Sequence, residues 1–316
     1  MEDHDAIVGD KLVRRVQAFT PSIILFPSSR QLIIRDKFMA KVKSIQSLYF
    51  SPTGNTKKII EAISKGVGLP VAKPIDFTLP RQRESWSGTV QSDLLIVGLP
   101  VYAGSFPSLI LPFLKKLDGM GRWAVPVAVC GNVQMRTCLA DLTGVLKKQG
   151  FMIPAAANFI GQHSFATEDL PLGSGRPDQR DLRKAVNFGK KIASKMQDNP
   201  TDITSIRGGM VWIRQYLTGS LEAQGSSFLE RYSQIIRVSE QDRTHCENCQ
   251  KCVESCPTGA IDAKTLQISD TACIRCFACT SACPSGTKQK VVEPDPELRA
   301  WFLKQGSVRA EPQILL

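Results

Sequence analysis

The chain has 316 residues, enough for two modest domains, and its 42% hydrophobic and 22% charged residues are typical of a soluble globular protein. No apolar run approaches the roughly 20 residues of a membrane-spanning helix, and the acidic start of the chain is unlike a secretory signal. We therefore expect a cytoplasmic protein without a membrane span. The net charge of +11 favours a solvated basic face or docking of an acidic protein over nucleic-acid binding, because no aromatic residues are interleaved with the basic ones.

The first part of the chain changes character near Met39. Residues 1–38 have no sustained hydrophobic period, and we predict that they are a loose extension or a mis-assigned start. Between residues 39 and 196, apolar strands alternate with amphipathic helices, which indicates an α/β domain with a doubly wound, five-stranded parallel sheet. The predicted strands are 45–50, 71–77, 93–98, 125–130 and 151–160, and the predicted helices are 56–66, 108–117, 137–149 and 179–196.

The second part of the chain contains a connector, a small domain and a tail. Residues 197–239 are polar, and we expect short helices there at 210–217 and 228–236. Residues 240–292 hold most of the cysteines and are predicted to form a small α+β domain. Residues 293–316 carry no motif and are expected to be a C-terminal tail.

Eight of the ten cysteines form two copies of one pattern. In each copy, three cysteines are separated by two residues, and a fourth follows after three more and precedes a proline. Three such thiolates can bind three irons of one cubane, whereas the fourth lies too far along and ligates the neighbouring cluster. A structural zinc site uses pairs with a longer spacer and fits poorly. We predict one [4Fe–4S] cluster on Cys246, Cys249, Cys252 and Cys283, and another on Cys273, Cys276, Cys279 and Cys256.

A candidate phosphate site follows the first predicted strand. The segment Ser51-Pro-Thr53-Gly54-Asn55-Thr56 opens a helix, whose N-terminal N–H groups and dipole suit a phosphate dianion. Gly54 permits close approach of the backbone, and the three hydroxyl groups add donors. Since no lysine follows the glycine, this segment is not an NTP-binding P-loop. An ordinary Ser/Thr helix cap is the alternative.

These two motifs carry a family resemblance. The hydroxyl-x-Thr-Gly-x-Thr pattern resembles that of flavodoxins, and the eight-cysteine segment resembles bacterial-type two-cluster ferredoxins. The chain is therefore similar to the flavodoxin–ferredoxin fusion proteins of anaerobic bacteria and archaea, over residues 40–165 and 240–290. The resemblance implies FMN at the carboxyl edge of a flavodoxin-like sheet and low-potential electron transfer by two clusters. The segment after Cys283 is more basic than is usual in ferredoxins, which affects potentials and docking.

The resemblance also implies that the loop after the third strand lies along the flavin. Its candidate contacts are Pro100, Val101, Tyr102 and Gly104. Tyr102 is expected to stack on the ring, with a purely buried role as the alternative. Gly104 is expected to supply a peptide that meets N5 of the reduced flavin.

The loop after the fourth strand offers Gly131 and Asn132 as further cofactor contacts. Family members often carry a tyrosine near the position of Met135, which this chain lacks, so a second stacking face is not identified. We interpret Cys130 as a small buried residue rather than a reactive thiol. His163 is either near the cofactor mouth or an ordinary surface histidine.

The sequence thus predicts an electron-transfer protein that passes electrons between two [4Fe–4S] clusters and FMN, and to or from protein redox partners such as an acidic ferredoxin or flavodoxin. Two alternatives remain, an FMN-dependent reductase of a small substrate and a redox-responsive iron–sulfur binding module. Whether the protein is an enzyme stays open. The glycines at 119 and 121 precede a strand instead of following one, so a nicotinamide site is not expected.

Overall fold

The structure is a computed structural model of the chain and describes residues 42–102, 104–132, 137–198, 200–203, 206, 235–240 and 243–316. The predicted extension at residues 1–38 and the helix expected at 210–217 lie outside the described residues, as does most of the helix expected at 228–236. Within the described ranges, no helix is both long enough and apolar enough to cross a membrane.

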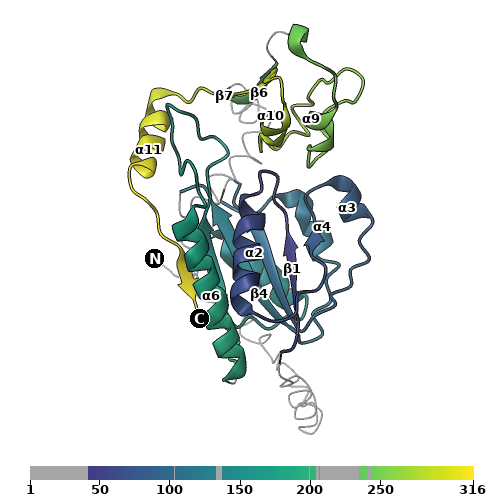
Figure 1. Cartoon of the computed structure of the whole chain (residues 1–316), viewed down its shortest axis with the longest axis vertical. Coiled ribbons are helices and arrows are strands. Elements are labelled where there is room, and N and C mark those ends of the chain that lie inside the picture. The colour runs from purple at the N-terminus through teal and green to yellow at the C-terminus, as the bar shows by residue number, and fades with distance from the viewer. Residues whose placement is uncertain are drawn as a thin grey trace, which may run out of the picture. The chain divides into compact units, whose positions relative to one another are not determined.

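The larger sheet has the strand order of a flavodoxin-like fold. Its order is β2-β1-β3-β4-β5-β8, and the first five strands run parallel (Figure 1). The order 2-1-3-4-5 is the doubly wound arrangement of flavodoxin, so the predicted fold class is confirmed. The bounds are β1 (Ile45–Tyr49), β2 (Ile75–Asp76), β3 (Leu94–Pro100), β4 (Trp123–Cys130), β5 (Ala156–Ile160) and β8 (Gln313–Leu315).

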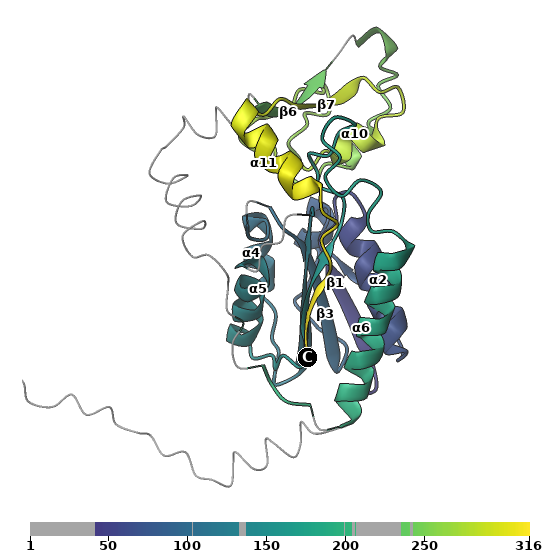
Figure 2. The same ribbon diagram turned by 90° about the vertical axis from the view of Figure 1, so that its left-hand side faces the viewer.

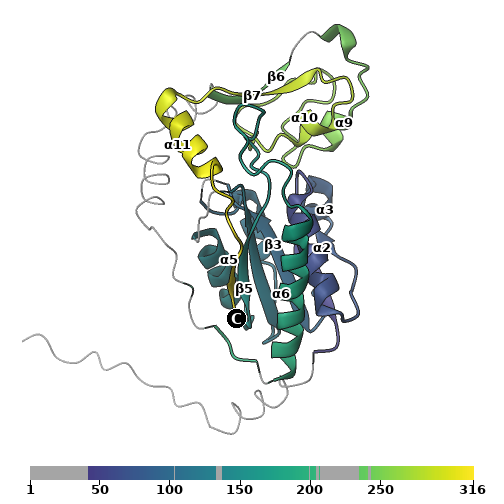
Figure 3. The same cartoon turned by 60° about the vertical axis from the view of Figure 1, so that its left-hand side comes forward.

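The sixth strand was not predicted. β8 pairs antiparallel with β5, with Leu315 opposite Ala156 and Gln313 opposite Asn158. The preceding residues form helix α11 (Pro296–Gly306), so the residues expected to be a tail without motif contain a helix and a strand. Figures 2 and 3 show the C-terminal segment running from α11 to the edge of the sheet. A three-residue strand is too short to give a periodic signal, which explains why the sequence did not indicate it.

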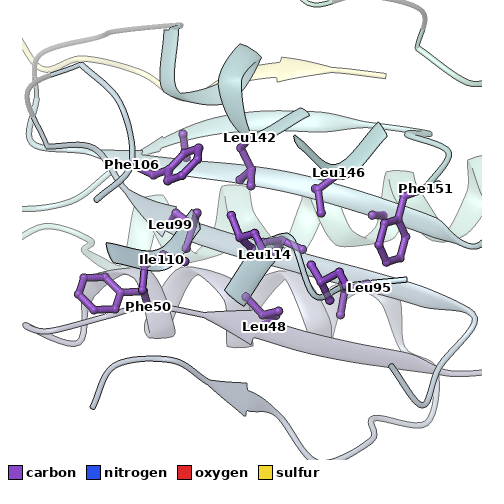
Figure 4. Close-up of a cluster of buried hydrophobic side chains, with 14 of the residues drawn as sticks. Leu48, Phe50, Leu95, Leu99, Phe106, Ile110, Leu114, Leu142, Leu146 and Phe151 are labelled. Carbon is purple, nitrogen blue, oxygen red and sulfur yellow. The ribbon is translucent and has the colours of Figure 1, made fainter. Parts of the chain in front are cut away.

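Helices cover both faces of this sheet. Helices α2 (Asn55–Val67) and α6 (Gln179–Gln197) lie on one face, and α4 (Leu111–Leu114) and α5 (Thr137–Lys148) lie on the other (Figure 2). The apolar residues of α2 recur at helical spacing and are buried against the strands. Figure 4 shows the second core, in which Leu114, Leu142 and Leu146 pack over residues of the central strands.

Prolines explain why two of the predicted strands are too long. The strand predicted at 71–77 is reduced to the two residues of β2, after Pro74, and the strand predicted at 151–160 begins only after Pro154. Proline has no backbone N–H to donate to a neighbouring strand. The helix predicted at 108–117 is a 3₁₀ turn, η1 (Ser108–Ile110), followed by the one-turn helix α4. A short helix α3 (Pro80–Glu84) follows β2.

Two glycines let α2 and α6 approach each other closely. A Cβ atom on Gly66 would lie 2.1 Å from the carbonyl oxygen of Val186, and one on Gly189 would lie 2.2 Å from that of Ile63. Any side chain at either position would therefore push the helix backbones apart. This contact fixes the helix whose N-terminus carries the candidate phosphate loop.

The cysteine-rich segment has little regular structure. A two-stranded antiparallel sheet pairs β6 (Ile236–Glu240) with β7 (Lys288–Val292). The remaining elements are the 3₁₀ turn η2 (Arg243–His245) and the short helices α9 (Lys251–Glu254) and α10 (Ala278–Ala282). Between the two cysteine repeats, Ile261 and Ile268 form a single antiparallel bridge.

Candidate functional site

The two cysteine repeats share one backbone conformation. Asn248 and Arg275 follow the first cysteine by two residues and have φ values of 53° and 55°. Gln250 and Phe277 follow it by four residues and have φ values of 61° and 60°. Residues other than glycine rarely adopt this left-handed backbone conformation, and backbone strain of this kind concentrates at functional sites. The sequence repeat is therefore also a repeat of two tight cysteine loops.

Each fourth cysteine lies beside a hydroxyl group two residues later. Cys256 Sγ is 3.6 Å from Thr258 Oγ1, and Cys283 Sγ is 3.5 Å from Ser285 Oγ. The backbone N–H of Ala260 also donates to Cys256 Sγ, at 3.3 Å. Donors of this kind stabilise a thiolate, and hydrogen bonds to cluster sulfurs influence the reduction potential.

The first three cysteines of the first repeat and the last cysteine of the second line one cavity. This cavity is also lined by Leu266, which lies between the bridge partners Ile261 and Ile268, and by Lys288 at the start of β7. Its cysteines are Cys246, Cys249, Cys252 and Cys283. The four thiols that the sequence assigns to the first cluster thus line the same space, although Cys283 is far from the others along the chain.

The other four cysteines are also neighbours. Burial raises the pKa of Cys276 and Cys279 to about 12, and the nearby Cys273 and Cys256 add to this rise at both. Cys256 also adds to the rise that burial causes at Cys273. Buried thiols of this kind become thiolates only when a cation binds them, which fits a metal cluster.

Each set of four cysteines has the number of thiols that a [4Fe–4S] cubane needs. A [4Fe–4S] cluster binds one thiolate at each iron, so its ligands surround a volume rather than a single point. The residues present therefore fit iron–sulfur clusters.

The phosphate loop has the geometry of a helix N-terminal anion site. Gly54 is the N-cap of α2 with φ 83°, and a Cβ atom there would meet nothing within 4 Å. Ser51 Oγ accepts the backbone N–H of Lys57 at 3.0 Å, which leaves its hydroxyl hydrogen available to an anion. The backbone N–H of Ser51 donates to Thr78 Oγ1 at 3.0 Å, so the loop is tied to the segment after β2.

The other candidate phosphate contacts differ in exposure. Thr53 is exposed, Asn55 is half-buried, and Thr56 is buried at 2% exposure. The side-chain amide of Asn55 donates weakly to the carbonyl of Gln162, at 3.4 Å. The open space at Gly54 and the N–H groups at the start of α2 fit a monophosphate, since the first N–H groups of a helix have no partner within it.

The loop after β3 continues the sheet for one residue and then turns. Pro100 ends β3, and the N–H of Val101 donates to the carbonyl of Val129 at 2.9 Å. Tyr102 and Ser105 exchange two backbone hydrogen bonds, of 2.7 and 3.1 Å. Tyr102 is half-buried and packs against the core cluster on the α4/α5 face. Its predicted stacking on the flavin stays a prediction.

Gly104 and Gly131 each occupy a position with a constrained backbone. Gly104 has φ 86°, and its carbonyl accepts a 2.6 Å hydrogen bond from Thr137 Oγ1, so the orientation of this peptide is already fixed. A Cβ atom on Gly131 would lie 2.5 Å from Cα of His163. Cys130, just before it, is 2% exposed, which confirms the interpretation of a small buried residue.

Asn132 has a structural role that the sequence did not indicate. Its amide nitrogen donates to the carbonyls of Gln305 and Val308, both at 3.0 Å. Its amide oxygen accepts from Arg176 Nη1 at 3.1 Å and from the N–H of Ala310 at 3.2 Å. In this structure the side chain therefore holds the C-terminal segment, and its predicted contact with FMN stays a prediction.

His163 is half-buried and packs against two aromatic rings, unlike an ordinary surface histidine. Its ring centroid is 4.7 Å from that of Phe165 and 5.8 Å from that of Phe302. The backbone N–H of Phe165 donates to His163 Nδ1 at 3.0 Å, which favours the neutral ring. Burial and the charge of Lys290 lower the pKa of His163 from 6.5 to about 4.

We predict that His163 makes the protein less stable in mild acid. In the unfolded chain the pKa of His163 is 6.5. Below pH 6.5 the unfolded state therefore binds more protons than the folded state, and the free energy of unfolding falls until the pH reaches about 4. Between pH 7.5 and 5.5 this amounts to about 1 kcal/mol. Urea unfolding of the wild type and of His163→Phe should give this difference in pH dependence. An identical dependence in both proteins would contradict the assignment.

The sequence did not predict two contacts that join the flavodoxin-like region to the cysteine-rich region. Arg83 is buried, and its Nη2 donates to the carbonyl of Pro257 at 2.7 Å, directly after Cys256. The ring centroids of Phe165 and Phe277 are 6.2 Å apart, and Phe277 lies between two cluster cysteines in the sequence. No local pattern marks these residues, because long-range packing produces the contacts.

Comparison with known proteins gives one family match and several structural ones. Residues 239–292 match the family described as a 4Fe-4S dicluster domain. No curated protein matches the chain. A flavodoxin from the domain Archaea is 16% identical and covers 49% of this chain and 99% of its own, with a TM-score of 0.35. Rubredoxin oxygen:oxidoreductase from the anaerobe Desulfovibrio gigas is 14% identical, and the match covers 51% of this chain and 38% of that protein, with a TM-score of 0.38.

The assignment of the first domain rests on its own strand order, and that of the second rests on the family match. The resemblance drawn from the phosphate loop and the cysteine pattern agrees with both. The chain therefore joins a flavodoxin-like α/β domain to a 4Fe-4S dicluster domain, as the flavodoxin–ferredoxin fusion proteins do.

Proposed function

We propose that this protein transfers electrons between two [4Fe–4S] clusters and one FMN, and exchanges them with protein redox partners. The observation that carries the proposal is the grouping of the eight cysteines. Cys283 lines one cavity with the first three cysteines of the first repeat, and Cys256 neighbours the first three cysteines of the second. This grouping supports crossed ligation, with four thiolates for each cluster.

The start of α2 is proposed to bind the FMN phosphate. The N–H groups there and the hydroxyl of Ser51 would donate to its oxygens, and Gly54 would let the backbone approach. When bound, FMN supplies one- and two-electron chemistry, whereas a cluster carries single electrons. The loops of Tyr102, Gly104 and Gly131 are proposed to surround the ring.

The chain's own contacts support transfer between the two domains. Arg83 donates to the carbonyls of Thr78 and Pro257, at 2.9 and 2.7 Å, and Thr78 in turn accepts the N–H of Ser51. A continuous set of hydrogen bonds therefore runs from the phosphate loop to the residue after Cys256. Such contacts tie the proposed phosphate site to the cysteine-rich region, as transfer within one molecule would need.

The external partner is proposed to be a protein with an acidic docking face. The net charge of +11 supports this, because complementary charge accelerates association of redox proteins. Exchange with such a partner should slow as salt is added, since the Debye length shortens from about 10 Å at 0.1 M to about 3 Å at 1 M.

Cofactor analysis and a variant of Gly54 test the proposal together. Anaerobically purified protein should contain about eight Fe, about eight acid-labile sulfides and about one FMN per chain. In Gly54→Val, the new side chain occupies the space proposed for the phosphate, and we expect at least about tenfold weaker FMN binding with unchanged iron. Flavin fluorescence titration and iron analysis measure the two quantities separately.

Gly68→Val is the matched control for this variant. Gly68 ends the same helix, has φ 72°, and also has nothing within 4 Å of an added Cβ atom, so the backbone strain is similar. It should therefore cost stability without weakening FMN binding. Equal loss of FMN in both variants would argue against the phosphate site, and zinc without sulfide in the wild type would argue against the clusters.

A further inference from the structure

The two cysteine loops share a backbone conformation but differ in the side chains between their cysteines. The first loop reads Cys246-Glu-Asn-Cys-Gln-Lys-Cys252, and the second reads Cys273-Ile-Arg-Cys-Phe-Ala-Cys279. Gln250 and Phe277 occupy the same position in the two loops, with φ values of 61° and 60°. Isoleucine, phenylalanine and alanine in the second loop thus stand where the first loop has glutamate, glutamine and lysine.

The exposure of the two loops follows this difference in polarity. Glu247, Cys249 and Lys251 of the first loop are exposed. In the second loop, Cys276 and Phe277 are only 7% and 2% exposed. The first loop therefore faces solvent, whereas the second is covered by other parts of the chain.

The flavodoxin-like domain provides the cover of the second loop. The ring of Phe277 lies 6.2 Å from that of Phe165, at an interplanar angle of 87°, and both belong to a buried cluster with Leu172. Ile274 packs against the core cluster on the α4/α5 face, against which Tyr102 also packs. The apolar side chains that distinguish the second loop are therefore the ones that contact the flavodoxin-like domain.

These contacts lead toward the loops proposed to surround the flavin. The ring centroid of Phe165 is 4.7 Å from that of His163, and a Cβ atom on Gly131 would lie 2.5 Å from Cα of His163. Arg83 adds a polar contact, because its Nη2 donates to the carbonyl of Pro257 at 2.7 Å. Pro257 directly follows the cysteine that is predicted to complete the cluster of the second loop.

We infer that the cluster predicted on Cys273, Cys276, Cys279 and Cys256 is the one that exchanges electrons with FMN, and that the cluster of the first loop reaches FMN through it. An electron that leaves the first cluster reduces the second, which is oxidised again when it passes the electron on. Two such transfers, with protons from solvent, reduce one FMN, and a reduced ferredoxin supplies the electrons. The close packing of the second loop supports this order, since electron transfer slows as the distance between redox centres grows.

The inference rests on the proposed function, because it requires both kinds of cofactor. The competing explanation is that Ile274 and Phe277 only join the two domains mechanically. The variant Ile274→Glu/Phe277→Gln separates the two explanations. It gives the second loop the side chains that the first loop already has at the same backbone conformation.

The matched control makes similar changes far from the proposed flavin loops. Val71 and Met120 are apolar and exposed, at 55% and 59%. Val71 pairs with Ile45 at the start of β1, and Met120 precedes β4, so both lie at the amino-terminal edge of the parallel strands. The control variant is Val71→Glu/Met120→Gln, which introduces the same two polar side chains.

Each full-length protein is mixed anaerobically with reduced ferredoxin. EPR of freeze-quenched samples follows cluster reduction, and absorbance follows flavin reduction, expressed per bound FMN. Hydrogen exchange of the backbone N–H groups of residues 165–172 measures the contact with Phe277 without any turnover.

In Ile274→Glu/Phe277→Gln, the clusters should be reduced at the wild-type rate, whereas the flavin should be reduced at least about tenfold more slowly. Hydrogen exchange in residues 165–172 should become faster, because Phe277 no longer packs there. The control variant should match the wild type in all three measurements. If the test variant does not assemble clusters, Phe165→Ala carries the test, since it removes the same ring contact and changes neither cysteine loop.

Flavin reduction at the wild-type rate, together with faster hydrogen exchange, would overturn the inference and leave Ile274 and Phe277 a mechanical role. Unchanged exchange, or equally slow flavin reduction in the control, would overturn it as well. Iron, sulfide and FMN analysis of the wild type keeps these results separate from a failure of the proposed function. A wild type without clusters or FMN would overturn both, whereas intact cofactors with unchanged rates would overturn only the order of transfer.

Discussion

Replacing Cys283 with alanine is expected to abolish one cluster and disturb the other, while FMN binding survives. Cys283 lines a cavity with Cys246, Cys249 and Cys252, so its loss leaves that set with three thiolates. It also precedes the segment that leads to Lys288 and β7. Since a metal-bound segment of this kind gains its folding free energy from the metal, the whole cysteine-rich region should be affected.

The variant also tests whether electrons reach the flavin through the clusters. The proposed FMN contacts lie in the loops after β1, β3 and β4, which contain no cluster cysteine. Cys283→Ala should therefore keep about one FMN per chain but lose rapid flavin reduction by a reduced ferredoxin, while direct reduction by dithionite continues. Anaerobic stopped-flow recording of flavin bleaching, at several salt concentrations, measures both rates.

Cys138→Ala is the control for the removal of a cysteine. Cys138 is buried in α5 and belongs to neither cysteine repeat. Its replacement should cost some stability through lost packing, but should leave the iron content and the rate of flavin reduction unchanged. Equal bleaching rates in the wild type and Cys283→Ala would mean that the clusters do not feed the flavin, and the redox-responsive binding module would then be the better explanation.

The parts of this protein that sequence could predict depend on local rules. The spacing of the cysteines is one such rule: it indicates two sets of four, and Cys283 does line a cavity with Cys246, Cys249 and Cys252. The ligation of the two clusters itself stays a prediction. The alternation of strands and helices is another, and it led to the correct sheet. Two strands were predicted too long where Pro74 or Pro154 interrupts an apolar run. A prediction based on hydrophobicity does not take into account that proline has no backbone N–H to donate to the next strand.

The features that sequence could not predict depend on packing between distant segments. A buried charge such as Arg83 or Lys288 looks like any surface cation until its environment is known. The sequence predicts that Asn132 contacts the flavin, because of the loop in which it lies. Its side-chain amide donates hydrogen bonds to carbonyls more than 170 positions later. The same holds for β8, whose three residues form a strand only because the edge of β5 is available.

The attachment of that C-terminal segment depends on a buried ion pair. Asp181 is completely buried and receives hydrogen bonds of 2.9 and 2.6 Å from Arg176, which is itself 5% exposed. Arg309, from the C-terminal segment, donates to the same carboxylate at 3.0 Å. Asp181 also accepts the N–H of Asp178 at the start of α6. One carboxylate therefore joins the helix, the loop before it and the C-terminal segment.

Asp181→Ala is expected to lower the free energy of unfolding by about 3–5 kcal/mol, because it leaves the guanidinium of Arg176 buried without its carboxylate. The C-terminal segment should loosen as well, since Arg309 loses one of its partners and Arg176 also donates to the carbonyl of Ala310. Urea unfolding followed by circular dichroism measures the first effect. Faster amide hydrogen exchange in Gln313–Leu315 measures the second.

Two further variants separate the effect of the buried ion pair from that of exposed ion pairs. Glu311→Gln removes ion pairs of the same segment with Arg180 and Lys184, but Glu311 is 42% exposed, so it should cost no more than about 1 kcal/mol. The double variant Arg176→Met/Asp181→Leu replaces both buried charges with apolar groups and should recover much of the loss, because the cost comes from the uncompensated charge. If Asp181→Ala and Glu311→Gln cost the same, or the double variant recovers nothing, the buried pair does not hold the C-terminal segment in the way its geometry indicates.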